Sequence, residues 1–137
     1  MIWNIYDFTD AKGESVIQGW ATAIGVSAKM RGRFDLKVDM LSKNGPNLSP
    51  QLLAGTKAGH IKKLKIKGDI QLRPHLCIGP IDNDKEYTFL VGAVERDWKL
   101  IPEDVLSQAQ ACRTNLVNSN LTKIFPLRRI QHEPLSR

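Results

Sequence analysis

One stretch constrains this chain more than any other, because apolar and basic side chains alternate between Ile61 and Arg73. The polar positions are Lys63, Lys65, Lys67, Gln71 and Arg73, and the apolar positions are Leu64, Ile66, Ile70 and Leu72. A period of two predicts β-strands with one buried face and one solvent-facing face. The solvent-facing side is almost entirely cationic, so we expect the function of the protein on that face.

The loop between these two strands decides which residues pair. A loop of three residues, 67–69, pairs Ile66 with Ile70 and Leu64 with Leu72, which keeps one face apolar. A two-residue loop would instead place charges opposite core residues. The sequence therefore favours the three-residue loop.

Periodicity and turn signals divide the first part of the chain into short elements. The first expected element is a strand at residues 2–8. It is followed by a helix that is capped by Thr9 or Asp10, has an apolar stripe of Val16, Ile17, Trp20 and Ile24, and ends at Gly25. A second helix is expected from its cap at Ser27 to Gly45, and then a loop at residues 46–60. The two helices are joined by a short turn and should form an antiparallel hairpin.

The later part of the chain contains an apolar strand and a last helix. Tyr87 to Val94 is apolar on both faces, as expected of an interior strand that is covered on each side. Pro102 is expected to open a helix at its first position, with Val105 and Leu116 on its buried stripe. The order of elements predicts an α+β domain at residues 1–118, with an N-terminal helical hairpin, a C-terminal helix and helices packed on one side of a small, mostly antiparallel sheet of about four strands. Residues 119–137 form a basic C-terminal tail.

Charge and cysteine content narrow the class of protein. The formal net charge of +6 favours anionic partners, with nucleic acid first among them. No apolar run approaches the roughly 18 residues that cross a bilayer, and the start of the chain lacks the pattern of a secretion signal, so we expect a cytoplasmic protein with no membrane partner. Cys77 and Cys112 are expected to be free, and no Cys or His spacing suggests a metal site or a cofactor.

Two segments resemble a known family. LKIKGDIQLRP resembles the segment of phage-derived HigB-like toxins of the RelE/ParE superfamily that ends in Glu-Leu-Arg, with Gln71-Leu72-Arg73 at those positions. YTFLVGAVERDWKLIPEDVLSQAQACR is similar to the last strand, basic turn, proline-opened helix and helical arginine of that family, the last of these at Arg113. Glu95 and Asp97 stand where the family's basic turn has a lysine and a threonine.

The resemblance implies a RelE-like fold and a toxin of a type II toxin-antitoxin system. Characterised members are commonly mRNA endonucleases (mRNA interferases) that act on the ribosome and are bound by a small antitoxin protein, whereas the ParE branch poisons gyrase. The expected partners are RNA and a cognate antitoxin, and a homodimer is one alternative for the oligomeric state. A phage-derived accessory protein that binds nucleic acid without cleaving it is the alternative from another class, and a ParE-like gyrase inhibitor is a further alternative.

Metal-independent RNA cleavage needs a base for the 2′-OH, a cation for the pentacoordinate phosphate and an acid for the 5′-oxygen. The candidate catalytic residues are Arg73, Arg96, His75 and Lys99, and the candidate RNA-binding residues are Lys62, Lys63, Lys65, Lys67, Trp98 and Arg113. Each has a simpler alternative. Arg73 could form an ion pair with Asp69 or Glu95, His75 could be structural, and the lysines could protect an edge strand from aggregation.

Overall fold

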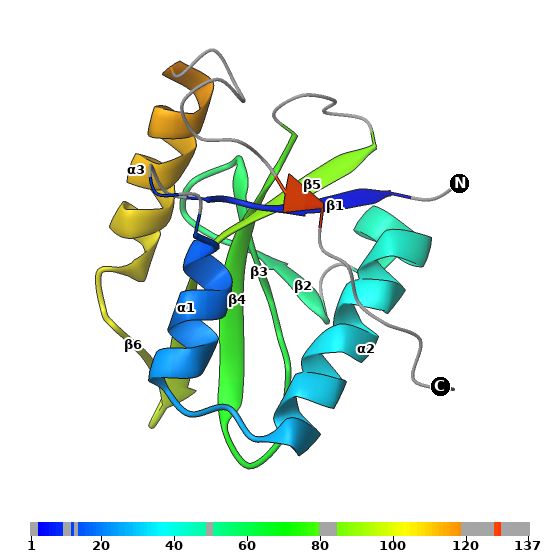
Figure 1. The fold of residues 1–137 in the computed structure, drawn as a ribbon, viewed down its shortest axis with the longest axis vertical. Helices are drawn as coiled ribbons and strands as arrows, with labels where there is room; N and C mark the ends of the chain where they lie inside the picture. Colours follow the sequence, from blue (N-terminus) through cyan, green and yellow to red (C-terminus); the bar gives the residue numbers. More distant parts are fainter. Residues whose placement is uncertain are drawn as a thin grey trace.

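The fold is built on one mixed β-sheet with helices on both of its faces (Figure 1). The computed structural model describes residues 3–9, 12, 14–48, 51–79, 85–118 and 128–129. Its elements are β1 (Asn4–Asp7), α1 (Val16–Ala23), α2 (Ala28–Asn44), the 3-10 helix η1 (Gly45–Leu48), β2 (Leu53–Gly55), β3 (Ile61–Leu64), β4 (Gln71–Ile78), β5 (Glu86–Arg96), β6 (Lys99–Ile101), α3 (Val105–Asn118) and β7 (Arg128–Arg129). The predicted α+β class is confirmed. The predicted tail lies outside the described residues except for β7.

The sheet is larger than the sequence predicted. Its strand order is β2-β3-β4-β5-β1-β7, and β6 pairs with β5 outside this path. β1 runs parallel to β5, and the other neighbouring strands are antiparallel. The expectation of about four strands was wrong because β2 and β6, at three residues each, are too short to show a periodic pattern. β2 and η1 both fall in the segment that was expected to be a loop.

The register of the basic strands differs by two residues from the predicted one. Ile66 bridges Leu72, not Ile70, and Lys63 pairs with His75. A shift of two preserves the side-chain faces, so Leu64, Ile66 and Leu72 are all buried on one side as predicted. The wider turn is held by α2, because Arg33 Nη1 donates to the carbonyl oxygen of Lys67 at 2.7 Å. Such a tertiary contact is not visible in the local turn sequence.

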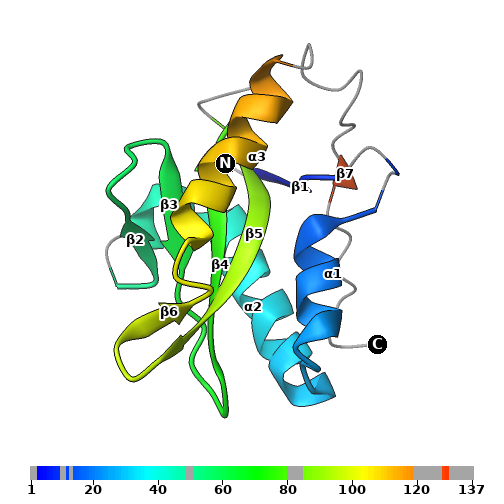
Figure 2. The same cartoon turned by 90° about the vertical axis from the view of Figure 1, so that its left-hand side faces the viewer.

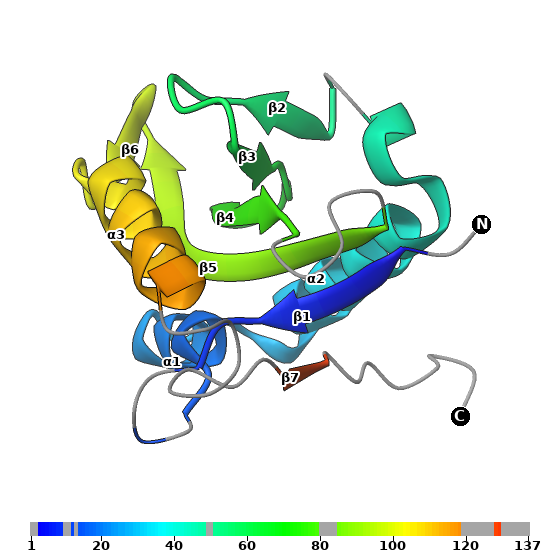
Figure 3. The same cartoon turned by 90° about the horizontal axis from the view of Figure 1, so that it is seen from above.

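The helices cover opposite faces of the sheet (Figures 2 and 3). α1 and α2 pack on one face through Ile17, Met30, Val38 and Leu41, against Leu64, Leu72, Tyr87 and Phe89. α3 packs on the other face through Val105, Ala109 and Leu116, against Ile61, Cys77, Leu90 and Ala93. The expectation that all helices lie on one side was therefore wrong. Burial of β5 on both faces is confirmed, and it is the reason that both faces need a cover.

The ends of the helices follow local chemistry at most positions. Ser27 caps α2 as predicted, and its Oγ accepts from the Met30 N–H at 3.2 Å. α1 is capped by Ser15, not by Thr9, because Thr9 forms a β-bridge with Ser15; Asp10 lies outside the described residues. α3 begins at Val105, and Pro102 precedes it by one turn. α1 and α2 run in opposite directions but splay apart (Figure 1).

None of the helices in the described ranges is both long and apolar enough to cross a bilayer.

Gly92 on β5 provides a test of the packing between α1 and the sheet. A Cβ added at Gly92 would overlap the indole of Trp20. We expect Gly92→Ala to lower the free energy of unfolding by about 2 kcal/mol, because overpacking forces side chains and backbone apart. Urea denaturation measures the change.

Gly19→Ala is the matched control. Gly19 lies in α1, next to Trp20, and a Cβ added there would contact no atom within 4 Å. It should raise the free energy of unfolding by about 0.5 to 1 kcal/mol through helix propensity. Equal effects of the two substitutions would contradict the packing of Trp20 on Gly92.

Candidate nucleic-acid interface

A cleft on the α3 face of the sheet brings together most of the cations that the sequence singled out. It lies between the β3–β4 turn and the β5–β6 hairpin. We call it the basic cleft and define it by two adjoining hollows. The larger is lined by Gln51, Lys65, Lys67, Gln71, Arg73, Glu95, Asp97 and Trp98, and the smaller by Lys63, Glu95, Trp98, Lys99, Leu100 and Glu103. Five basic side chains meet three acidic ones on these walls.

Strand pairing explains why these side chains converge. Lys63 pairs with His75 and Gln71 pairs with Glu95, and directly paired residues project from the same face of a sheet. Residues two positions apart on a strand also share a face. Arg73, midway between Gln71 and His75 on β4, therefore lies on the same face as Lys63 and Glu95. The register of β3, β4 and β5 thus assembles the cleft.

Arg73 lies at the floor of the cleft. The prediction that its side chain faces solvent was wrong. Only 4% of its surface is exposed. Its Nη1 donates to the carbonyl oxygen of Leu72 at 2.9 Å, and its Nε is 3.4 Å from Oε1 of Glu95. The Nε contact is an ion pair without hydrogen-bond geometry. Nη2 forms no hydrogen bond to any described residue.

Glu95 is a functional candidate that the sequence analysis missed. Its side chain is 28% exposed, and it lines both hollows of the basic cleft beside the Arg73 guanidinium. From the sequence, Glu95 was considered as the replacement of a lysine in the family's basic turn and as a possible ion-pair partner of Arg73, and this ion pair is confirmed. Its place on the same strand face as Ala93 and opposite Gln71 could have been found only with the register of β4 and β5 in hand.

His75 is buried beneath the cleft, with 1% of its surface exposed. Its Nδ1 is 2.9 Å from the carbonyl oxygen of Arg73, and because a carbonyl only accepts, Nδ1 carries the proton. Burial lowers the pKa of His75 below its usual value and the nearby Lys63 charge lowers it further, while the bond to the Arg73 carbonyl opposes them. A neutral, buried ring supports the structural alternative for this residue.

Three predicted residues lie away from the basic cleft. Lys62 precedes Lys63 on β3, so its side chain projects from the opposite face of the sheet. Arg96 is exposed at the end of β5 and lines neither hollow. Arg113 is half-buried on α3, near Cys77. Burial raises the pKa of the Cys77 thiol to about 12, and the positive charge of Arg113 opposes this rise. Lys63, Lys65, Lys67, Arg73, Trp98 and Lys99 are the predicted residues that the cleft brings together.

Trp98 stands at the tip of the β5–β6 hairpin with 95% of its surface exposed. Asp97 and Trp98 form the two-residue turn and have φ angles of 51° and 67°. Such turns favour Asn-Gly, because both positions require the left-handed region, which costs a side-chain-bearing residue roughly 1 to 2 kcal/mol. Trp98 thus occupies a strained, solvated position at the rim of the cleft. Strain of this kind points to a function.

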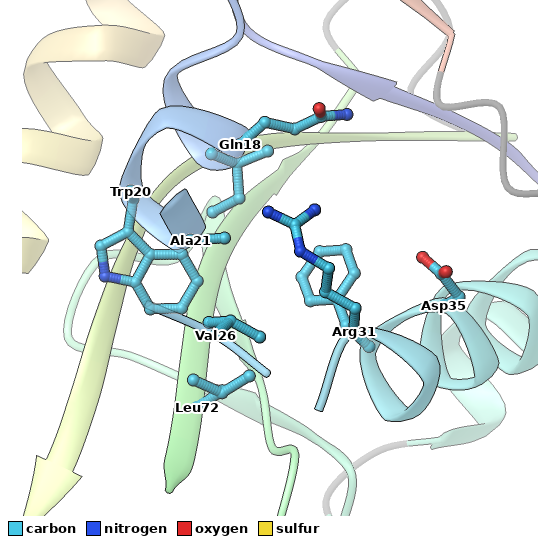
Figure 4. Close-up of a pocket in the computed structure, with 9 residues that line it drawn as sticks. Gln18, Trp20, Ala21, Val26, Arg31, Asp35 and Leu72 are labelled. Atoms are coloured by element: carbon cyan, nitrogen blue, oxygen red, sulfur yellow. The ribbon is translucent and has the colours of Figure 1, made fainter. Parts of the chain in front are cut away.

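A separate hollow, outside the basic cleft, lies between α1, α2 and β4 (Figure 4). Its walls are mainly apolar, with Trp20, Val26 and Leu72 along one side. Arg31 extends from α2, on the other side of the hollow, toward Gln18 (Figure 4). Its Nη2 donates to Thr22 Oγ1 at 3.5 Å. This hollow lacks the converging cations of the basic cleft.

Within the part of the chain that the structure describes, no three His, Cys, Asp or Glu side chains gather as a metal-binding group.

Comparison of the chain with models of protein families, with curated proteins and with solved structures finds no match.

The buried His75 ring makes stability depend on pH. In the unfolded chain the ring takes up a proton near its ordinary pKa of 6.5, whereas in the folded protein the pKa is lower. As pH falls below 6.5, the ring therefore becomes protonated in the unfolded state while it stays neutral in the folded state, and the free energy of unfolding decreases. Above that pH, the buried neutral ring of His75 makes its full contribution to the free energy of unfolding.

We expect His75→Asn to reduce the loss of unfolding free energy between about pH 7 and about pH 5. The asparagine amide still offers an N–H to the Arg73 carbonyl but does not titrate. Urea denaturation of both proteins at several pH values measures the difference. An unchanged pH dependence would contradict the placement of His75.

The strained turn also predicts that Trp98 costs the fold stability. Trp98→Gly should raise the free energy of unfolding by about 0.5 to 1 kcal/mol, because glycine relieves the left-handed strain at a smaller loss from its own flexibility. Little packing is lost, since Trp98 is 95% exposed. Thermal or urea denaturation measures the change, and a destabilised variant would show that the indole supports the fold.

Proposed function

We propose that this protein binds RNA in the basic cleft and cleaves it as a metal-independent endoribonuclease, in the manner of an mRNA interferase toxin. The observation that carries the proposal is the meeting of Lys63, Lys65 and Lys67 with the Arg73–Glu95 pair in one hollowed surface. Ammonium groups along a cleft attract a phosphate backbone, and a guanidinium beside a carboxylate supplies the two charges that cleavage requires.

Binding follows from the charge on the cleft walls. Lys65 and Lys67 line the larger hollow, and Lys63 and Lys99 line the smaller one. Lysines that contact phosphates release counterions, so affinity falls steeply as salt is added. Phosphate contacts fix the position of the strand and leave its sequence undetermined. Lys63 on β3, and Lys65 and Lys67 beyond its end, alternate with the buried Leu64 and Ile66, which keeps these three cations on the cleft side.

Cleavage would proceed by attack of the ribose 2′-oxygen on the adjacent phosphorus. Glu95 would take the proton of the 2′-OH as the general base. Arg73 would stabilise the charge of the pentacoordinate phosphate through Nη2. The bond from phosphorus to the 5′-oxygen then breaks, and Lys99 would donate a proton to that oxygen. The products are a 2′,3′-cyclic phosphate and a 5′-hydroxyl.

The RelE-like fold and the toxin-antitoxin role belong to the same proposal. The order of a strand, two helices, a strand series and a helix supports them, as do the two segments that resemble HigB-like toxins. A small antitoxin that covers the basic cleft would be the cognate partner, and a ribosome-bound mRNA would be the substrate.

A second candidate is RNA binding without cleavage. The specific observation in its favour is that Arg73 is 4% exposed and already paired with Glu95 at 3.4 Å. A guanidinium neutralised in this way would anchor a phosphate less strongly than a free one. Cleavage assays separate the two candidates because both predict binding.

We expect the purified protein to cut a single-stranded mRNA fragment in the presence of EDTA and to leave 2′,3′-cyclic phosphate ends. Arg73→Ala should lower the rate by roughly 100-fold or more, because it removes the cation that stabilises the transition state. Glu95→Gln should lower it by a similar factor while retaining binding. Gel electrophoresis with mapping of the ends measures both effects.

Lys29→Ala is the charge-matched control, because Lys29 is exposed on α2 outside the cleft. It should cut at the wild-type rate. A thermal melt of each variant shows whether it is folded. Undiminished cutting by folded Arg73→Ala would refute the proposed mechanism, and binding without any cutting by the wild type would favour the second candidate.

A further inference from the structure

The β5–β6 hairpin adds a feature that phosphate binding and cleavage do not use. Trp98 lines both hollows of the basic cleft and is 95% exposed. It contributes almost nothing to either core. Its backbone φ of 67° is one that glycine would adopt without strain. Solvation and backbone geometry both disfavour a tryptophan here, so its indole is better explained by what enters the cleft.

We propose that Trp98 is the specificity-determining residue of the cleft, and that it stacks a purine base of an unpaired RNA strand. This inference rests on the RNA-binding part of the proposed function and does not require cleavage.

The position of Trp98 among the lysines favours a nucleobase as the occupant. Lys63 and Lys99 line the smaller hollow with Trp98, and Lys65 and Lys67 line the larger one. A strand whose phosphates follow these cations carries its bases within reach of the hairpin tip. Stacking on an aromatic ring adds affinity at any base, because every base has a π-face. The two fused rings of a purine overlap an indole more fully than a pyrimidine ring does, so a purine is preferred.

The same geometry selects unpaired RNA. In a duplex the faces of each base are covered by the neighbouring base pairs, and the major groove of A-form RNA is too narrow for side chains. An indole at the rim would then find no free base face. Duplex RNA would still meet the lysines through its phosphates, so it would bind without the help of Trp98.

Binding of short oligonucleotides to the full chain tests the inference. The probes are fluorescein-labelled 2′-O-methyl heptamers, which lack the 2′-OH nucleophile and are not cleaved. One is all uridine and the other carries a single central adenosine. Anisotropy titrations should show that the wild type binds the adenosine heptamer about fivefold more tightly, a preference that stacking supplies.

Trp98→Ala should weaken binding of the adenosine heptamer by about tenfold and abolish the preference, whereas Trp98→Phe should retain part of it. Lys65→Ala, the matched cleft variant, should weaken both heptamers equally and reduce the salt dependence while keeping the preference. Binding of a 14-base-pair duplex should be the same for the wild type and Trp98→Ala. These results together would support the inference.

The failures are distinguishable. If the wild type binds both heptamers and Trp98→Ala keeps the same affinities, the stacking role is overturned while RNA binding stands. An equal loss of duplex and single-strand affinity in Trp98→Ala would also overturn it, because the indole would then be acting on the backbone. If the wild type binds no RNA, the proposed function fails together with this inference.

Discussion

The pairing of β4 with β5 is the constraint on which the rest of this structure depends. The ladder runs from Gln71 opposite Glu95 to Ile78 opposite Tyr87. Because β5 is buried through most of its length, its position fixes both hydrophobic clusters at once. The register shifts by one residue between His75 and Leu76, and a bulge of this kind bends and twists the strands. The half of the ladder before that bend, which contains Gln71, Arg73 and Glu95, carries the basic cleft.

The ion pair of Arg73 and Glu95 connects this ladder to function. A guanidinium with 5% of its side chain exposed needs a compensating charge, since burial of an unpaired cation is costly. Glu95 supplies that charge from the neighbouring strand, with its carboxylate still partly in solvent. The same arrangement keeps a base and a cation beside each other in the cleft. The Arg73–Glu95 ion pair therefore contributes both to the stability of the fold and to the proposed chemistry.

Much of the fold could be predicted from local patterns, because those patterns record burial. The alternation at Leu64, Ile66 and Leu72 identified the buried face of the basic strands, and the apolar run before Glu95 identified the central strand. The cap at Ser27 was also predictable from its side chain. The two short strands, the shifted turn at Gly68 and the place of α3 depend on tertiary contacts, and these leave no local signal.

The candidate site was predictable in part for the same reason. The side-chain faces of Lys63, Lys65 and Arg73 follow from a period of two, which a shift of two residues does not change. The burial of Arg73 and His75 could not be predicted, because it depends on how β3 and the β5–β6 hairpin pack on either side of β4. The role of Glu95 depends on which residue faces it across the strands. The sequence named Glu95 as a possible ion-pair partner of Arg73, but it could not show that both residues line one cleft.

The parallel pairing of β1 with β5 has a consequence for how the chain acquires its shape. Asn4 on β1 lies opposite Glu86 on β5, so the hydrogen bonds between these strands form only after the long intervening chain has been synthesised. Closing so long a loop carries an entropic cost that must be met before the contacts form, which slows the search for the native state. On the ribosome, β1 therefore cannot form its parallel ladder until β5 has emerged.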